Sequence, residues 1–203
     1  MMWMSFFSAQ YTDLEAVSRA TKRIKVFAQH IDPISAGRGI GAVLPEAVRE
    51  AGAVGVLLNH AEKPMTLYDL ESAIIRAREC GLISLVCAGT AEQGAAVACL
   101  KPDIVLAESP LLIGAGRRSR EDMKEVDRIN QMIHLVDPEI SVLHGAGIAD
   151  AQDVYEVIRA GADATGSTSG IFKSADPEAM IDRMIGSVAR AWKERNCGFE
   201  QSE

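Results

Sequence analysis

The stretch "EAGAVGVLLNH", residues 50–60, contains the joint on which the fold of this chain depends. A helical pattern ends at a glycine, and a short apolar run then leads to Asn59 and His60. "ECGLISL" (79–85) and "RAGADAT" (159–165) repeat this order of helix end, glycine and strand. Apolar runs without alternation are typical of parallel strands that helices cover on both faces. The three joints therefore predict a repeated βα unit.

Short apolar runs and helical patterns alternate along almost the whole chain. The predicted strands are 5–9, 24–29, 54–59, 82–88, 103–108, 140–147 and a weaker 163–167. The predicted helices are 12–20, 44–52, 66–80, 91–99, 122–136, 150–160 and 177–193. Thr12 and Thr66 are candidate N-caps of the first and third helices, because a hydroxyl can accept a hydrogen bond from a free N–H of the first turn.

Consecutive βα units are compatible with two architectures, an open doubly wound sheet and a TIM (β/α) barrel. The first predicted strand is not followed by GxGxxG, which weakens the dinucleotide-binding form of the open sheet. A barrel normally has eight units, and the predicted count is one short of that. We expect an α/β protein, with residues 1–203 as a single domain.

Composition narrows the classes of function. A net charge of −7 argues against a nucleic-acid groove, which needs a basic field to meet phosphates. Four cysteines without a CxxC pair indicate free thiols in a reducing compartment and no metal-like spacing. The opening "MMWMSFFSAQ" lacks the basic start and the long apolar run of a signal peptide or membrane span. These features predict a cytoplasmic protein that binds neither nucleic acid nor membrane.

Active sites of such scaffolds lie where the strands end, so the residues at those positions are the candidates for chemistry. A histidine and a glutamate on different strands, such as His60 and Glu108, form a natural pair for proton transfer. Each also has a purely structural explanation, as a satisfied histidine or as a glutamate that caps the next helix. The other strand-end candidates are Gln29, His30, Cys87, "HGAG" (144–147) and "STSG" (167–170). His134, between two apolar helical residues, is expected to be structural.

Taken in order, these segments resemble the archaeal type of triosephosphate isomerase. The likeness runs from about residue 6 to residue 185 and matches strands two to eight of that barrel. The segments that carry it are "VFAQHIDPISAG", "LPEAVREAGAVGVLLNHAEKPM", "ESPLLIGAG", "HGAGIADAQDV" and "SGIFKSADPEAMI". The resemblance implies a TIM barrel that lacks its first βα unit and so has seven strands.

The resemblance also implies a reaction. The family interconverts dihydroxyacetone phosphate and glyceraldehyde 3-phosphate through an enediolate, in glycolysis and gluconeogenesis, without metal or cofactor. In this family a glutamate is the base and a neutral histidine is the electrophile. By motif, Glu108 corresponds to the base that moves the proton between C1 and C2, and His60 to the electrophile that polarises the carbonyl.

Further site residues follow from the same match. "SPLLIGAG" resembles the lid that closes over the substrate in this family. Ile113 and Gly114, within that lid, are expected to approach the substrate. Gly147 and the segment Thr168, Ser169 and Gly170 are expected to bind the phosphate, a dianion that backbone N–H groups hold well.

Three departures from the family pattern bear on activity. The family's first strand carries an Asn-x-Lys whose ammonium neutralises the substrate, and nothing near residue 1 replaces it. The loss of such a cation costs several kcal/mol of transition-state stabilisation, roughly a thousandfold in rate. Ala61 and Ala149 stand where the family usually has serine. The segment "RRSREDMKE" after the lid is unusually charged, and we expect Arg117 and Arg118 to form a solvated helix start rather than a substitute cation.

The origin of the missing strand stays open at this point: a miscalled start, a true truncation, or a gap filled by "MMWMSFF" or by a neighbour. Two alternative functions also stay open, a non-catalytic protein that binds sugar phosphates and an isomerase of a longer phosphorylated ketose. The family assembles through the long loop after its third strand, here "HIDPISAGRGIGAVLPE". A homodimer or homotetramer is therefore expected.

Overall fold

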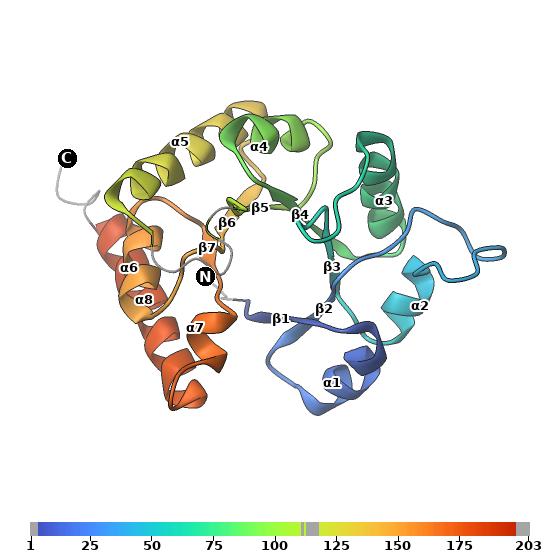
Figure 1. Ribbon diagram of the computed structural model, residues 1–203, viewed down its shortest axis with the longest axis horizontal. Helices are drawn as coiled ribbons and strands as arrows, with labels where there is room; N and C mark the ends of the chain where they lie inside the picture. The colour runs from blue at the N-terminus through green and yellow to red at the C-terminus, as the bar shows by residue number, and fades with distance from the viewer. Residues whose placement is uncertain (1–3, 111, 113–117, 198–203) are drawn as a thin grey trace. The chain divides into compact units, whose positions relative to one another are not determined.

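The computed structural model describes residues 4–110, 112 and 118–197. Its strands form one sheet in chain order, and every pair whose register is defined runs parallel. The strands are β1 (Phe6–Ala9), β2 (Lys25–Ala28), β3 (Gly55–Leu58), β4 (Ile83–Ala88), β5 (Ile104–Ala107), β6 (Ser141–His144) and β7 (Ala164–Thr165). All seven predicted strands are confirmed, and the repeated βα unit with them (Figure 1).

The helices follow the predicted alternation with two additions. They are α1 (Leu14–Ala20), α2 (Pro45–Glu50), α3 (Leu67–Glu79), α4 (Ala91–Ala98), α5 (Arg120–Val136), α6 (Ala151–Arg159), α7 (Ser169–Phe172) and α8 (Pro177–Cys197). The helix α7 and a single 3-10 turn, η1 (Tyr11–Asp13), are short elements that the apolar periodicity does not predict.

The glycine joints behave as their positions in the sequence indicate. Gly52, Gly81 and Gly161 have φ of 94°, 66° and 113°, a region that residues with a side chain rarely adopt. Each of them ends a helix in the left-handed conformation and turns the chain into the next strand. The three repeated motifs are therefore the same structural device.

One predicted cap is confirmed and one is wrong. The Thr66 hydroxyl accepts a hydrogen bond from the N–H of Asp69, 3.1 Å away, and so caps α3. Thr12 lies inside η1 and does not cap α1, which begins at Leu14. The extra turn exists because the Gln10 side chain accepts from the N–H of Tyr11 and starts a tighter helix first.

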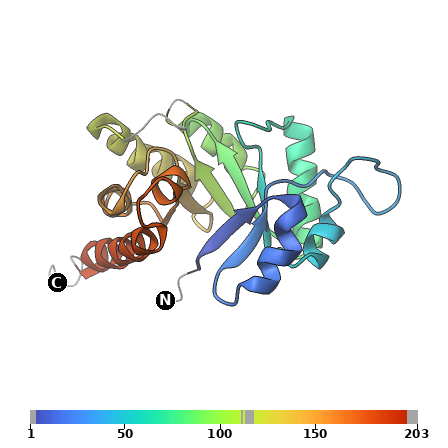
Figure 2. The same ribbon diagram turned by 60° about the horizontal axis from the view of Figure 1, so that its bottom comes forward.

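By their contacts, the residues divide into two compact units. The first comprises residues 1–87 and 100–104, and the second comprises residues 88–99 and 105–203. In the first unit, β1, β2 and β3 pair in parallel, and Phe27, at the centre of this core, stacks on Phe6 with ring centroids 4.4 Å apart. The loop between β2 and α2 extends away from the helices (Figure 2), and Ile40 within this loop is fully exposed. That the two units form one domain remains a prediction.

In the second unit, helices pack in pairs around the ends of β5, β6 and β7. Helix α4 lies beside α5, and α6 lies beside α8 (Figure 1). An apolar cluster lies between α5, α6 and α8 and includes Val126, Val157, Ile158 and Ala191, each completely buried. This packing fixes the loops that follow β6 and β7, which carry most of the predicted site residues.

Among the described residues, no helix is long and apolar enough to cross a membrane. Within the same ranges, no group of three or more His, Cys, Asp or Glu side chains is arranged to hold a metal ion. Cys80, Cys87 and Cys99 form no disulfide bond within the part of the chain that the structure describes.

Candidate active site

His60 lies in a tight turn at the end of β3, in the first unit. Asn59, which precedes it, has a φ of 56°, in the left-handed region that asparagine tolerates better than most residues. The Asn59 amide donates to the carbonyl oxygen of Cys87 at 3.1 Å and accepts from the N–H of Met65 at 2.9 Å. Asn59 therefore ties the end of β3 to the end of β4 and to the loop that follows, and it fixes the start of the turn that carries His60.

The tautomer of His60 follows from its backbone neighbour. The N–H of Glu62 donates to Nδ1 of His60 at 3.3 Å, so Nδ1 acts as an acceptor. In a neutral imidazole the other nitrogen, Nε2, then carries the proton. The Glu62 carboxylate also lies 3.5 Å from Nδ1, but that side chain is 85% exposed, and water screens its charge. The backbone contact therefore sets the tautomer and places the proton of the neutral ring on Nε2.

Glu108 follows β5 directly, in the second unit. Its N–H donates to the carbonyl oxygen of Ala88 at 2.9 Å, which continues the strand pairing to the last position before the loop. Its side chain is half-buried and lies against Gly145, where an added Cβ would come within 2.9 Å of Oε1. The carboxylate is thus partly removed from water and packed on the glycine-rich loop after β6.

Polar contacts hold that loop, residues 145–149, at its C-terminal end. Gly147 has a φ of 76°, which favours glycine. Beyond it, the carboxylate of the buried Asp153 accepts from the N–H groups of Ala149 and Asp150, at 2.8 and 3.1 Å. Asp150 in return accepts from the N–H of Asp153 and completes a capping box at the start of α6.

The loop after β7 packs on the same segment. The Ser167 hydroxyl donates to the carbonyl oxygen of Ile148 at 2.6 Å and accepts from the N–H of Gly170 at 3.2 Å. An added Cβ on Gly170 would lie 2.6 Å from the carbonyl oxygen of Ala149. The close approach of the two loop backbones therefore requires that residue 170 has no side chain.

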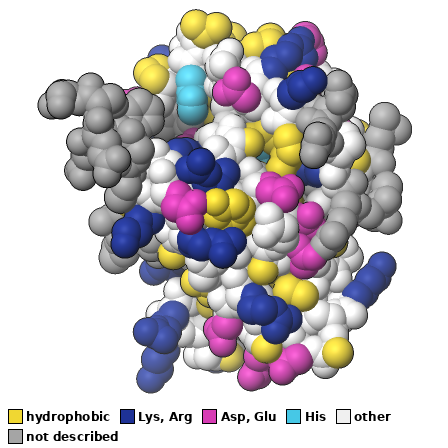
Figure 3. Space-filling model, turned by 90° about the vertical axis from the view of Figure 1, so that its left-hand side faces the viewer, with side chains coloured by type: hydrophobic (Ala, Val, Ile, Leu, Met, Phe, Trp, Pro, Cys, Tyr) yellow, Lys and Arg dark blue, Asp and Glu magenta, His cyan; other side chains and the backbone are white. Residues whose placement is uncertain are grey.

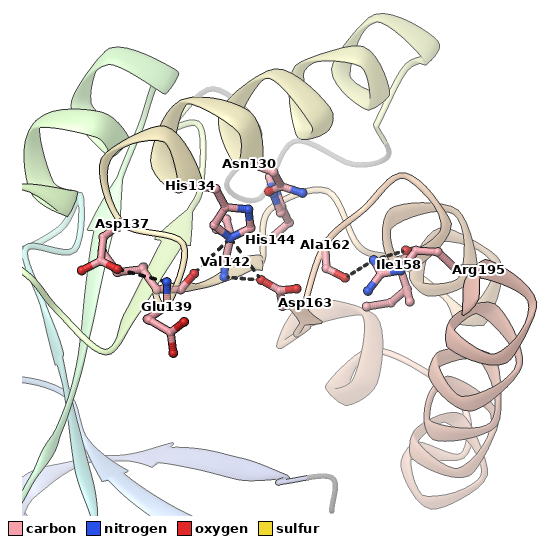
Figure 4. A network of polar contacts seen from close by, with 11 residues as sticks. Asn130, His134, Asp137, Glu139, Val142, His144, Ile158, Ala162, Asp163 and Arg195 are labelled. Atoms are coloured by element: carbon pink, nitrogen blue, oxygen red, sulfur yellow. Dashed lines mark hydrogen bonds and ion pairs between the residues drawn. The ribbon is translucent and has the colours of Figure 1, made fainter. Parts of the chain in front are cut away.

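A buried hydrogen bond between His144 and Asn130 joins the end of β6 to α5. His144 is completely buried, and its Nε2 lies 2.8 Å from Oδ1 of Asn130 on α5, so the neutral ring donates this hydrogen bond (Figure 4). Burial, with a smaller contribution from the positive charge of Arg118, lowers the pKa of His144 to about 3. The carbonyl oxygen of His144 accepts from the Thr165 hydroxyl at 2.8 Å, which joins β6 to β7.

Two other histidines named in the sequence analysis have structural roles. Nε2 of His134 lies 3.1 Å from the carbonyl oxygen of Ile140 and 3.7 Å from the Asp163 carboxylate, which itself accepts from the N–H of Val142 (Figure 4). His30 is buried, with Nε2 at 3.3 Å from the Asp32 carboxylate. Burial lowers the pKa of His30, against the hydrogen bond and the charge of Asp32.

Arg118 departs from the expectation of a solvated helix start. It is half-buried, and its Nε donates to the carbonyl oxygen of Ala146 at 2.7 Å. Burial lowers the pKa of its guanidinium, and the charges of Asp122, Glu108 and Asp153 oppose that change. Arg118 thus interacts with both the glycine loop and the candidate base. The prediction that this arginine is merely solvated is wrong; Arg117 lies outside the described residues.

A depression between α6 and α8 contains charges of both signs. Its lining includes Asp150, Gln152, Arg183 and Arg190, and basic and acidic side chains mix across this face of the unit (Figure 3). The guanidinium of Arg190 lies over the ring of Tyr155, 4.3 Å from its centroid, so this cation already has a partner.

The second unit brings together Glu108, Gly147 and the segment from Thr168 to Gly170, while His60 belongs to the first unit. Ile113 and Gly114 lie outside the described residues. Sequence reasoning named Arg118 and Ser167 but not their partners, Ala146 and Ile148, which lie far away along the chain. It also missed Asp153, although "DAQD" (150–153) has the spacing of a capping box.

Comparison with known proteins identifies the family of the chain. A family model described as triosephosphate isomerase matches residues 4–183. A triosephosphate isomerase from Methanobacterium bryantii is 41% identical over 180 residues, which are 88% of this chain and 79% of the relative. A second, from Sulfurisphaera tokodaii, is 40% identical over 169 residues, 83% of this chain and 73% of the relative.

The fold has a solved counterpart. The crystal structure of triosephosphate isomerase from Bartonella henselae matches with a TM-score of 0.70 at 17% identity, over 94% of this chain and 87% of that one. At this identity the match supports the fold alone, and it confirms the TIM-barrel class among the two architectures that the βα repeat allows. The family model and the archaeal relatives show the family as well as the fold: the chain belongs to the triosephosphate isomerase family.

Proposed function

We propose that this protein interconverts dihydroxyacetone phosphate and glyceraldehyde 3-phosphate, with Glu108 as the base and His60 as the electrophile. One observation carries the assignment: the half-buried carboxylate of Glu108 lies against the glycine loop that would receive the phosphate. A small phosphorylated substrate requires a base and an anion-binding loop that lie next to each other. Family membership supplies the reaction.

Glu108 would move the proton. Its carboxylate takes the proton from C1 of dihydroxyacetone phosphate, the C–H electron pair forms the C1–C2 double bond, and the carbonyl oxygen becomes the oxyanion of an enediolate. A proton then passes from the C1 hydroxyl to the C2 oxygen, and the same carboxyl group returns its proton to C2 while the electron pair on the C1 oxygen forms the aldehyde carbonyl. Partial burial favours this role, because a carboxylate that loses part of its hydration becomes a stronger base.

His60 would stabilise the oxyanion. With Nδ1 accepting from the N–H of Glu62, the neutral ring presents Nε2–H as its donor. A donor held in place before the reaction stabilises developing negative charge without reorganisation cost. Asn59, by fixing the turn, would set the direction of that donor.

The phosphate would be bound by backbone N–H groups of the two loops. Gly147 and the exposed residues Thr168 and Ser169 are the proposed donors. The N–H of Gly170 already donates to Ser167, so the contribution of Gly170 is close approach of the loops rather than a direct bond. Ile113 and Gly114 remain proposed substrate contacts from the family motif.

We further propose that a polypeptide of these 203 residues turns over slowly, because its sequence contains no Asn-x-Lys to neutralise the phosphorylated substrate. A homodimer or homotetramer in the cytoplasm is the proposed state. Sugar-phosphate binding without turnover, and isomerisation of a longer ketose phosphate, are the alternatives that the assay has to separate.

A coupled isomerase assay tests the function. We expect turnover of both triose phosphates above the buffer rate, abolished in Glu108→Gln and reduced at least about a hundredfold in His60→Gln. Glu71→Gln, which removes an exposed carboxylate on α3 of the same unit, serves as the control and should stay within about threefold of the unaltered protein. Parallel assays with tetrulose and pentulose phosphates examine the longer substrates. Equal rates for the protein and Glu108→Gln would refute the proposed base.

A further inference from the structure

We propose that Arg118 is a positioning residue for phosphate binding, which acts by holding the Ala146–Gly147 peptide so that the Gly147 N–H faces the phosphate. This inference rests on the proposed function, since it deepens the description of the same site. It assigns a role to a charged residue that the sequence analysis expected to be solvated.

The geometry of one peptide bond carries the argument. Nε of Arg118 donates to the carbonyl oxygen of Ala146 at 2.7 Å, a short distance for an N–H···O bond. A trans peptide is planar, so its carbonyl oxygen and the following N–H point in opposite directions. When Arg118 holds the Ala146 oxygen, it therefore also fixes the direction of the Gly147 N–H, on the other side of the plane.

The position of this contact in the loop makes it decisive. Gly147 has a φ of 76° and no side chain, so the chain itself restrains this peptide little. After it, the carboxylate of Asp153 holds the N–H groups of Ala149 and Asp150. Arg118 holds the loop before Gly147 and Asp153 holds it afterwards.

The electrostatic surroundings explain how a partly buried guanidinium is tolerated. Glu108, Asp122 and Asp153 all interact with Arg118 and offset the cost of its burial. The positive charge also polarises the Ala146 carbonyl and, through the peptide, makes the Gly147 N–H a better donor to an anion. The same side chain thus links the loop to the segment that carries the candidate base.

Three substitutions separate the hydrogen bond from the charge. Arg118→Gln keeps an amide nitrogen at the position of Nε but removes the charge. Arg118→Lys keeps the charge but places its donor further along the side chain, and Arg118→Met removes both. Arg183→Met, on the exposed face of α8, changes the net charge equally and serves as the control.

Phosphate affinity is the measurement, because a merely structural role would lower the active fraction instead. We expect the dissociation constant for inorganic phosphate, from calorimetric titration, to rise about tenfold in Arg118→Met, and KM for dihydroxyacetone phosphate to rise with it while kcat changes little. Arg118→Gln should bind phosphate within about threefold of the unaltered protein, and Arg118→Lys should resemble Arg118→Met.

The opposite outcomes overturn the inference. Unchanged phosphate affinity in Arg118→Met, or a fall in kcat with KM unchanged, would show that the residue does not position the phosphate loop. Rescue by lysine but not by glutamine would show that charge, rather than the bond to Ala146, is responsible. If Arg118→Met does not fold, the Gln and Lys variants decide the question between them.

Failure of the proposed function gives a different result. A protein without isomerase activity that still binds phosphate, and loses that affinity in Arg118→Met with rescue by Gln, would retain the positioning role and lose only the reaction. If the enzyme is active but its phosphate affinity does not change on substitution of Arg118, the proposed reaction stands and the positioning role is refuted.

Discussion

Gly145 and Glu108 are packed so closely that no side chain fits between them: a Cβ on residue 145 would lie 2.9 Å from Oε1 of Glu108. The glycine belongs to the loop after β6 and the glutamate follows β5, so two consecutive strand ends meet at the carboxylate. The contact links the candidate base to the candidate anion site.

Gly145→Ala tests this contact. The new methyl group would also lie 3.1 Å from Leu106, so the carboxylate has to move. Because misplacement by about 1 Å can cost a hundredfold in rate, we expect kcat to fall by about that factor while the protein remains folded. Gly166→Ala, where an added Cβ meets nothing within 4 Å, is the control for steady-state kinetics and thermal unfolding. Normal kcat in Gly145→Ala would show that the close packing is irrelevant to the base.

The two loops meet at Gly170, and Gly170→Ala should separate them. Its Cβ would lie 2.6 and 2.8 Å from the carbonyl oxygens of Ala149 and Ile148, which are backbone atoms that cannot rotate away. We expect the loops to part and KM for the triose phosphate to rise about tenfold or more, with a smaller change in kcat. Initial-rate kinetics measures KM and kcat, with Gly166→Ala again as the control. A change confined to kcat would contradict the proposed anion site.

Asn59 is predicted to stabilise the turn that carries His60. Asn59→Gly keeps the left-handed backbone but removes the hydrogen bonds to Cys87 and Met65. We expect a loss of about 1–3 kcal/mol in unfolding free energy by urea titration, and a lower kcat. Asn59→Ala adds backbone strain and should be less stable than the glycine variant. If both variants keep full activity, the orientation of His60 does not depend on this side chain.

The buried His144 predicts how stability depends on pH. Its pKa is about 3 in the folded protein, against an ordinary value of 6.5. Between these values the unfolded chain binds more protons, so stability rises with pH across this window and is lost as the pH falls. In His144→Gln, which cannot titrate, the slope of unfolding free energy against pH should be smaller by up to about 1.4 kcal/mol per pH unit. Urea titrations between pH 4 and 7.5 measure both slopes, and identical slopes would disprove the assignment to this histidine.

The regular elements were predictable because their signals are local. The glycine at each helix end and the apolar run after it indicate one joint, and Gly52, Gly81 and Gly161 all adopt the expected left-handed conformation. Thr66 caps α3 within one turn of itself. The cap at Thr12 was mispredicted because a nearer competitor, the Gln10 side chain, starts a 3-10 turn first.

The supporting contacts of the site were not predictable in this way. Arg118 meets Ala146 across 28 residues and Ser167 meets Ile148 across 19, so neither pair leaves a periodic or spaced signal. Glu108 and His60 were proposed from their positions at strand ends and from family motifs. Neither kind of evidence shows which backbone carbonyl or N–H group forms a hydrogen bond with each residue. The tautomer of His60, for example, depends on a single backbone N–H.

Isomerisation in deuterium oxide tests the central claim most directly. If Glu108 carries a proton between C1 and C2 and exchanges it with solvent, NMR of the products will show deuterium at the carbon next to the carbonyl group. Glu108→Gln, with enough protein to detect slow turnover, should give neither product nor exchange. Product formed without any deuterium, or exchange that persists in Glu108→Gln, would contradict the account.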